Sequence, residues 1–572
     1  MEMYKTIIAK QLSSLLEQVT EEEIKALMAY PQHADMGDLC LPCFKLSKLY
    51  RKAPQQIAEQ LAEQLSGDII ERVEAVAGYV NIYLEKSKLV QQLVQQVLNE
   101  ADKFGARNIG QGKTIVIDFS SPNIAKPFHI AHLRSTVIGH ALYRIFTFLG
   151  YNCVRINHLG DWGTQFGKLI VAYRLWGNEQ RIAEHGIDEL LQLYVKFHEQ
   201  AEHDPSLEEQ ARQWFVRMEA GDEEALQLWR RFVDISVAEF KRIYALLGVE
   251  FDSYAGESFY NDKMERVVSE LKHKQLLVED DGASLVRLDD YQMPPALILK
   301  KDGSSLYHTR DIAAALYRKS AYSFDKAIYV TDYAQNLHFQ QWFKIIELLG
   351  YEWHKDLLHV AFGRVSLEGM GLSTRKGNII RLEEVLKQAI AKTKAIIEER
   401  NPTLADKDEV ARQVGVGAII FNDLSASRIK DIVFSWEDAL SFEGETGPYV
   451  QYAHARACNV LRKAEQKFGE IEFKSLGAEA FAALTDEASI QVVKQLAQFS
   501  EKVELAMNKL EPSIISRYTV DLAQSFNQFY HHNPILNAEE NVRQARLALV
   551  QAVQIVLGKG LELVGITAPK EM

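Results

Sequence analysis

The chain has 572 residues, which is too long for one hydrophobic core and predicts about three or four domains. Hydrophobic residues make up 47% and charged residues 25%, as in an ordinary soluble globular protein. The net charge of -13 excludes indiscriminate nucleic-acid binding, although a local basic surface could still hold a nucleic acid. No apolar run is long enough to span a membrane, and the amphipathic N-terminus does not resemble a signal peptide, so we expect a cytoplasmic protein without membrane contact.

Four cysteines are too few and too scattered for a disulfide framework. Cys40 and Cys43 have the spacing of a zinc pair, but a structural zinc site needs four ligands and no second pair follows at a suitable distance. Two buried thiols are the better interpretation, and no structural zinc is predicted.

Residues 1–108 are expected to form a small α+β domain. Helical patterns cover 4–28, 54–65 and 87–100, and a short strand pair covers 69–73 and 79–84. A basic helix near its centre carries Lys45, Lys48, Arg51 and Lys52 beside Phe44 and Tyr50. A solvated helix face accounts for these residues without a function.

Residues 114–157 have the pattern of a strand, a helix and a second strand, which is a βαβ unit. From Phe119 to Gly160 there is no acidic residue, so the start of this helix would favour an anion such as phosphate. His129 and His132 lie three apart, on one face of the first helical turn. Such a pair is as often surface or core histidine, but the missing carboxylates favour a functional site.

The motif HIAH at 129–132 resembles the HIGH motif of class I aminoacyl-tRNA synthetases, and SPNIAKPFHIAHLRSTVIG at 121–139 is similar to its form in arginyl-tRNA synthetases. The resemblance implies a multidomain α/β protein with a Rossmann-like parallel sheet in its catalytic domain. It implies that arginine is activated with ATP to arginyl-adenylate, releasing pyrophosphate, and is then transferred to the terminal adenosine of tRNA(Arg). His129 and His132 would be catalytic and would bind ATP.

The catalytic domain is expected to cover 109–404, with a helical insertion at about 168–280. The glycine-punctuated loop 157–167 also resembles the arginyl family. Further predicted elements are strands within 281–301, a helix at 312–318, a strand at 326–331, a helix at 335–349 and a strand at 358–365.

The segment 366–378 contains three glycines, three hydroxyl side chains and an Arg-Lys pair. A surface turn would have the same composition, but the position resembles that of the KMSKS loop of class I synthetases. The match is imperfect, because Gly371 and Thr374 stand at the lysine positions. The resemblance then gives Lys126 part of the phosphate role, and it stays open which of Lys126, Arg375 and Lys376 meets the α-phosphate.

Further site residues follow from the resemblance. Ser373, Arg375 and Lys376 would be catalytic together with Lys126. Gly371, Leu372, Ser373 and His338 would bind ATP, whose phosphates carry Mg²⁺ with no metal ligand from a protein side chain. The arginine substrate presents forked donors that need planar acceptors, and its expected ligands are Asp118, Asn123, Tyr307, Asp311 and Gln335. Each of these alone could be a helix cap or turn residue.

Residues 405–572 have helical patterns throughout, near 408–422, 446–468, 486–509, 511–532 and 539–563. The strings GETGPYVQYAHAR and VGITAPKEM resemble the anticodon-binding domain of arginyl-tRNA synthetases. Tyr449, Tyr530 and Met572 are then expected to contact tRNA, although aromatic residues at helical spacing are more often core. The resemblance also implies that residues 1–108 bind the corner of the tRNA. We expect the chain to act as a monomer.

Two alternatives remain at this point. A synthetase for another amino acid would share the superfamily motifs. A non-catalytic tRNA-binding relative would share the fold, although the intact His129 and His132 pair argues against it.

Overall fold

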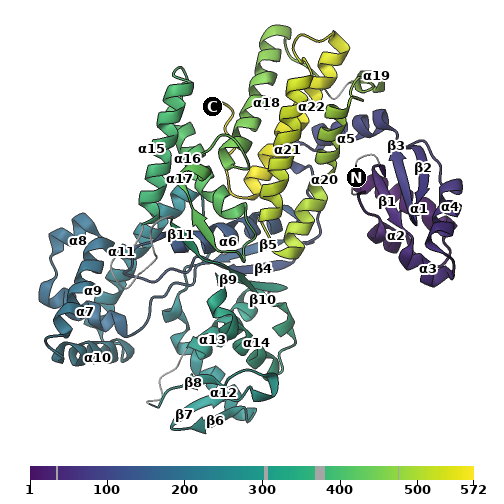
Figure 1. Cartoon of the computed structure of the whole chain (residues 1–572). Coiled ribbons are helices and arrows are strands. Elements are labelled where there is room, and N and C mark those ends of the chain that lie inside the picture. The colour runs from purple at the N-terminus through teal and green to yellow at the C-terminus, as the bar shows by residue number, and fades with distance from the viewer. Residues whose placement is uncertain (32, 34–35, 302–306, 368–380, 474–475) are drawn as a thin grey trace.

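The computed structural model describes residues 1–572 apart from 32, 34–35, 302–306, 368–380 and 474–475 (Figure 1). A parallel sheet lies at the centre of the molecule, with a bundle of long helices above it and two smaller lobes beside and below it. The N-terminal domain lies at one side of the helical bundle, next to α20 (Glu487–Lys509).

The central sheet has four parallel strands in the order β10-β9-β4-β5. Its strands are β4 (Thr114–Asp118), β5 (Asn152–Ile156), β9 (Lys326–Asp332) and β10 (Leu357–Phe362). The helices that connect and cover them are α6 (Ile130–Phe148), α13 (Tyr307–Tyr322) and α14 (Asn336–Leu348). Strand β5 lies on one side of β4, and β9 and β10 lie on the other, so the strand order reverses beside β4. Open α/β sheets bind ligands at such a point.

Local sequence explains why α6 packs so closely on the end of β4. The middle residues of β4, Ile115, Val116 and Ile117, are fully buried, as in a strand covered on both faces. Gly139 lies in the middle of α6, where a Cβ would come within 2.2 Å of the Phe119 ring. Glycine at this position therefore allows the helix to approach the chain directly after β4.

The N-terminal domain is a three-stranded antiparallel sheet, ordered β1-β3-β2, packed against helices. Its elements are α1 (Glu2–Leu15), α2 (Glu21–Leu27), β1 (Leu39–Pro42), α3 (Phe44–Tyr50), α4 (Pro54–Gln64), β2 (Ile70–Val76), β3 (Tyr79–Leu84) and α5 (Lys86–Glu100). Ion pairs join it to α20, from Lys5 to Glu501 at 3.2 Å and from Asp38 to Lys494 at 2.6 Å.

Two insertions separate the halves of the central sheet. The first is helical and contains α7 (Thr164–Trp176), α8 (Glu179–His185), α9 (Ile187–Ala201), α10 (Ser206–Glu219) and α11 (Glu223–Leu247). The second holds α12 (Met264–His273) and an antiparallel sheet of β6 (Leu277–Asp280), β7 (Ala283–Val286) and β8 (Ala296–Leu299). In Figure 1 the two form separate lobes, and neither contributes a strand to the central sheet.

The C-terminal part is mainly helical. Its elements are α15 (Leu382–Arg400), α16 (Lys407–Leu424), α17 (Trp436–Ala439), α18 (Gly447–Phe468), α19 (Ala478–Phe481), α20, α21 (Ser513–His532) and α22 (Glu540–Leu563). A short strand, β12 (Ile432–Phe434), pairs in parallel with β11 (Val365–Leu367), the strand that follows β10. In the part of the chain that is described, no helix is long and apolar enough to cross a membrane.

The fold predicted from the sequence is confirmed, with four local corrections. The pattern at 4–28 is two helices, because Thr20 and Glu23 form a capping box that starts α2. The strand predicted at 358–365 divides at Gly363 into β10 and β11. The region after 405 is not helical throughout, since it contains β12, and α7 already begins at Thr164 within the predicted loop 157–167.

Candidate active site

A cavity of about 560 Å³ opens at the carboxyl ends of β4 and β9. One wall is the start of α6, and the opposite wall is α13 with the segment that leads into α14. The residues that line it and matter for the chemistry are Asp118, Ser120, Ser121, Asn123, His132, Ser135, His158, Glu257, Tyr307, Asp311, Arg318, Gln335 and His338.

The two histidines of the HIAH motif form the N-terminal cap of α6. His129 is the N-cap residue, and its backbone N–H donates a hydrogen bond of 3.1 Å to Nδ1 of His132. The two rings stack with their centroids 3.8 Å apart. His132 therefore uses one ring nitrogen to cap the helix, and the ring itself lies in the cavity wall.

This hydrogen bond fixes the chemical form of His132. Because Nδ1 accepts a hydrogen bond from the backbone N–H, the neutral ring carries its own proton on Nε2. Burial lowers the pKa of His132 well below its usual value, and the nearby His129 and Lys126 add to the shift. Burial and Lys126 also lower the pKa of His129. The site thus presents a neutral Nε2–H donor at a helix N-terminus, which suits a phosphate oxygen.

The loop between β4 and α6 is held in an unusual conformation. Ser120, Ser121 and Ala125 have φ of 72°, 48° and 59°, a left-handed region that costs free energy for residues other than glycine. Hydrogen bonds hold two of them, from Ser120 N to Ser135 Oγ at 2.9 Å and from Ala125 N to Ser236 Oγ at 3.0 Å. Strain held in this way is typical of ligand-binding loops.

Asp118 lies at the end of β4 and is buried. Its Oδ2 accepts a hydrogen bond of 2.7 Å from Arg318 on α13, and its Oδ1 accepts one of 2.9 Å from Ser121 Oγ. The pKa of Arg318 is raised well above its usual value, because the neighbouring tyrosines and Asp118 outweigh the effect of burial. Within the part of the chain that is described, the Nε of Arg318 is buried without a hydrogen-bond partner, so this guanidinium has one donor left over.

Two further carboxylates face the cavity. Asp311 on α13 lies 2.5 Å from Nε2 of His338 on α14, and this contact lowers the pKa of Asp311 although burial works in the opposite direction. Glu257 lies 3.5 Å from Arg310. Burial raises the pKa of Glu257 to about 7, against the opposing effect of Arg310, and the neighbouring Asp311 and Asp161 add to the rise.

All five residues predicted for arginine, Asp118, Asn123, Tyr307, Asp311 and Gln335, line this one cavity. Tyr307 is 65% exposed and stands at its rim. His338, predicted for ATP, also lines the cavity. Lys126 is exposed at the start of α6.

The predicted phosphate-binding residues Gly371, Leu372, Ser373, Arg375 and Lys376 lie outside the described residues. Both described ends of that segment lie near α6. Strand β11, which ends at Leu367, packs against α6. On the other side, Arg381 forms a β-bridge with His129, and Leu382 N donates to the Phe128 carbonyl at 3.0 Å.

A separate cavity of about 610 Å³ lies between α15, α18 and α21 and contains two of the predicted tRNA residues, Tyr449 and Met572. Tyr449 accepts a hydrogen bond of 2.9 Å from Asn527, and Asn401 donates one of 3.2 Å to the Met572 carbonyl. Tyr530 is 38% exposed, and the Arg456 guanidinium lies 5.2 Å from the centre of its ring.

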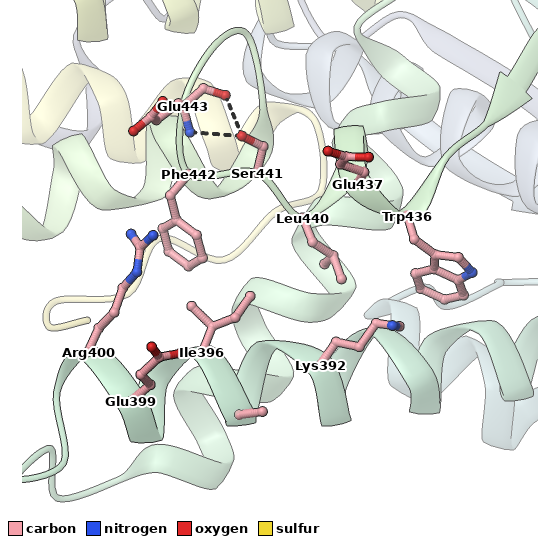
Figure 2. Close-up of a pocket in the computed structure, with 11 residues that line it drawn as sticks. Lys392, Ile396, Glu399, Arg400, Trp436, Glu437, Leu440, Ser441, Phe442 and Glu443 are labelled. Atoms are coloured by element: carbon pink, nitrogen blue, oxygen red, sulfur yellow. Dashed lines mark hydrogen bonds between the residues drawn. The ribbon is translucent and has the colours of Figure 1, made fainter.

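Figure 2 shows a groove of about 730 Å³ between α15 and the segment 436–443. Phe442 stacks under the guanidinium of Arg400 at 5.2 Å, and these two residues also line the cavity of Tyr449 and Met572. Among the described residues, none of those predicted from the sequence lines this groove, and its lysine, arginine and glutamate side chains form no catalytic arrangement.

Two of the charged residues in the active-site cavity, Glu257 and Arg318, were not predicted from the sequence. Arg318 follows Asp311 by seven positions on α13, so helical periodicity could have placed the two on one face. Glu257 begins a 3-10 helix (Glu257–Lys263) after the helical insertion, where no pattern in the sequence points to it.

The fold and the cavity define a class I tRNA synthetase. Residues 93–436 match the family model of the class I tRNA synthetase (R) catalytic domain, residues 450–572 match the DALR anticodon binding domain, and residues 2–84 match the arginyl tRNA synthetase N terminal domain. The chain belongs to the arginyl-tRNA synthetase family, the arginine–tRNA ligases, and the resemblance found in the sequence is confirmed.

Relatives agree over the whole length. The chain is 54% identical to the arginine–tRNA ligase of Alkaliphilus metalliredigens over 570 residues and 53% identical to that of Clostridioides difficile over 575, in each case with 100% of both chains covered. The arginyl-tRNA synthetase structure from Thermus thermophilus has a TM-score of 0.82 at 27% identity and covers 100% of this chain and 99% of its own. The structure from Plasmodium falciparum has a TM-score of 0.81 at 25% identity, with 100% and 98% covered.

Proposed function

We propose that the cavity between β4, α6 and α13 is where this chain activates arginine with ATP and then passes the arginyl group to the terminal adenosine of tRNA. One observation carries the proposal. Three carboxylates, Asp118, Asp311 and Glu257, line the same cavity as the neutral imidazole of His132 at a helix N-terminus. One side of the cavity thus suits a guanidinium and the other a phosphate.

The arginine substrate would take the acidic side. Asp311, Asp118 and Glu257 each have a basic partner in the free protein, namely His338, Arg318 and Arg310. A substrate guanidinium would share or replace these partners, and its planar fork matches carboxylate oxygens two at a time. Tyr307 at the rim, with Asn123 and Gln335, would orient the rest of the amino acid.

ATP would take the side formed by α6. The Nε2–H of His132 and the backbone N–H groups of the first helical turn would donate to phosphate oxygens. His129, stacked on His132, would hold the His132 ring in place. Lys126 would add positive charge, as would Arg375 and Lys376 from the segment between β11 and α15. Mg²⁺ would arrive on the phosphates, since the described residues offer no group of three or more His, Cys, Asp or Glu side chains for a metal.

The reaction needs orientation and charge stabilisation more than a covalent nucleophile. The arginine carboxylate attacks the α-phosphorus, the bond to the β-phosphate breaks, and pyrophosphate leaves. A ribose hydroxyl of the terminal adenosine then attacks the arginyl carbonyl, and AMP leaves. Donors on α6 favour both steps, because negative charge grows on phosphate oxygens as the first bond forms and again as AMP departs.

The tRNA would extend over the two outer domains, which we place at residues 1–108 and 405–572. In the helical domain, the cavity with Tyr449 and Met572 and the exposed Tyr530 would hold the anticodon. In the N-terminal domain, Phe44 is exposed at the start of the basic helix α3, and its ring centre lies 5.2 Å from that of Tyr79. This surface would contact the corner of the tRNA. We propose that the protein acts in the cytoplasm and as a monomer. Sedimentation of the pure protein would test whether it is a monomer.

A selective substitution tests the site. Asp311→Asn should raise the KM for arginine strongly in tRNA-dependent pyrophosphate exchange and leave the KM for ATP nearly unchanged. His132→Asn should lower kcat instead. If neither variant affects the reaction while both fold normally, the cavity is not the active site.

A further inference from the structure

Arg134 is a fully buried charge on α6, two residues after His132. Two positions along a helix turn the side chain through about 200°, so Arg134 points away from the cavity that His132 lines. Its Nε lies 3.4 Å from Oδ1 of Asp423, and its Nη1 donates to two carbonyl oxygens, that of Gly363 at 3.0 Å and that of Lys430 at 2.5 Å.

These three partners come from separate parts of the chain. Gly363 joins β10, at the edge of the central sheet, to β11. Lys430 precedes β12, and Asp423 lies near the end of α16. A single guanidinium therefore joins the catalytic helix to the end of the sheet and to two elements of the C-terminal part.

The segment around Lys430 is itself fixed to the strand that leaves the sheet. Gly363 N donates to the Arg428 carbonyl at 2.9 Å, and Arg364 N donates to Asp431 Oδ1 at 2.7 Å. From there β11 and β12 run in parallel. A Cβ on Gly363 would lie 2.6 Å from the backbone of Lys430, so the two segments are as close as glycine allows.

The same segment is anchored in the helical domain. Arg428 Nε donates to the Leu510 carbonyl at 3.0 Å, and Arg428 N donates to Glu511 at 3.2 Å, at the turn between α20 and α21. Residues 427–431 thus connect the helical domain, the exit of β10 and Arg134.

A buried ion pair is a poor way to gain stability, because desolvation of both charges offsets much of their attraction. Arg134 instead contributes hydrogen bonds in several fixed directions. Its fork reaches a carboxylate with one nitrogen and two carbonyls with another, which a lysine ammonium or an apolar side chain cannot do. Arg134 therefore fixes the position of α6 relative to β11 and to residues 427–431.

We propose that Arg134 is a positioning residue for the ATP step: it holds the His132 end of α6 in a fixed position relative to β11 and residues 427–431, so that the phosphate donors at the start of α6 are aligned with the end of the sheet. The role rests on the proposed ATP site. It predicts an effect on ATP in particular, because the carboxylates proposed for arginine lie on α13, at the end of β4 and at Glu257, and none of them contacts Arg134.

The burial of Asp423 helps to make the test practicable. Burial raises the pKa of Asp423 to about 6, although Arg134 opposes the rise. Without Arg134 this carboxyl would take up a proton near neutral pH instead of remaining as an isolated buried charge. The double variant Arg134→Met/Asp423→Leu removes both charges together and is the main test.

The experiment measures the KM for ATP and for arginine in pyrophosphate exchange, with tRNA present. The double variant should fold, as judged by circular dichroism, and raise the KM for ATP about tenfold, since misplacement by about 1 Å is costly in a preorganised site. The KM for arginine should change less than about twofold. Arg134→Lys should recover part of the loss.

Gly363→Ala tests the same alignment without removing a charge, because its Cβ must push Lys430 away, and it should also raise the KM for ATP. Two matched controls should not. Leu142→Ala lowers the stability of the same helix at a fully buried position, and Gly477→Ala adds a Cβ with no atom of the described residues within 4 Å.

An unchanged KM for ATP in the folded double variant, or an equal rise in Leu142→Ala, overturns the proposal. If the double variant does not fold, the KM for ATP of Gly363→Ala and of Arg134→Lys tests the proposal, and an unchanged KM in both overturns it. His132→Asn distinguishes a failure of the proposed active site from a failure of the positioning role of Arg134. If it leaves the exchange intact, the proposed site has failed; if it abolishes exchange while the Arg134 variants behave as wild type, only the positioning role has failed.

Discussion

The backbone N–H of His129 donates its hydrogen bond to Nδ1 of His132, so the second histidine of the motif caps the helix that the first one begins. This bond leaves the Nε2 proton of His132 as the donor for substrate. A motif of two histidines three apart is therefore one structural unit, with a capping nitrogen and the proposed phosphate donor on the same ring.

The two nitrogens can be separated by substitution. His132→Asn keeps an acceptor near the position of Nδ1 but lacks the donor at Nε2, so the helix cap should survive while catalysis falls. Loss of one such donor costs about 2.7 to 4 kcal/mol, or about a hundredfold to a thousandfold in kcat. Pyrophosphate exchange and thermal unfolding measured together check this. A large loss of stability in His132→Asn with little change in kcat would show that capping is the main role.

Glu257 predicts a pH dependence of arginine binding. With its pKa raised to about 7, Glu257 is protonated below that pH and ionised above it. A cationic substrate favours the ionised form, so affinity should rise with pH and be about tenfold weaker near pH 6 than near pH 8. Calorimetric titration of arginine into the free protein measures this.

The control is Glu257→Gln, which keeps the shape and removes the titration. Its affinity for arginine should be low and nearly independent of pH across the same range. A pH dependence as steep as that of the wild type would assign the titration to another group.

His140 predicts a pH dependence of stability. Burial lowers its pKa from 6.5 to about 3, with Arg144 and Arg155 adding to the shift. The unfolded chain therefore binds a proton below about pH 6.5 that the folded protein does not, so stability is present above that pH and is lost as the pH falls. At about pH 5 the loss from this group is about 2 kcal/mol.

His140→Gln keeps an acceptor for the Arg144 Nε–H, which bonds to His140 Nε2 at 2.8 Å. The variant should lose about 2 kcal/mol less than the wild type between about pH 7.5 and pH 5, in the urea transition that unfolds the catalytic domain. Parallel pH curves for the two proteins would contradict the shifted pKa.

Tyr530 predicts a selective loss of tRNA affinity. Its ring is partly exposed beside Arg456 and could stack on a base. Tyr530→Ala should weaken tRNA binding by about 1 to 3 kcal/mol, while Tyr530→Phe, which keeps the ring, should bind nearly as the wild type does. Filter binding at constant salt measures both. Equal affinity of all three proteins would make Tyr530 a surface residue without contact to tRNA.

Much of the catalytic fold could be predicted because its signals are local. The buried run of β4, the helical spacing of α6 and the glycine at 150 are read within a few turns of chain. The division of the strand at Gly363 could not be predicted, because β11 is specified by its pairing with β12, whose register joins Val365 to Ile432. Local patterns carry no information on such distant pairs.

The site shows the same limit. The motif led to His129 and His132, and the family resemblance led to five residues that share one cavity. The partner of Asp118 is Arg318, 200 positions away, and the position of Glu257 depends on where an insertion returns to the sheet. Likewise, no local pattern marks Arg134, since its three partners meet it only in the folded chain.

One assay tests the central claim most directly. Pure protein is incubated with ATP, Mg²⁺, tRNA and each amino acid in turn, and the charged tRNA is measured. The account predicts that arginine alone is joined to tRNA and that the product disappears in His132→Asn. Charging with a different amino acid, or no charged tRNA from folded protein, would contradict it.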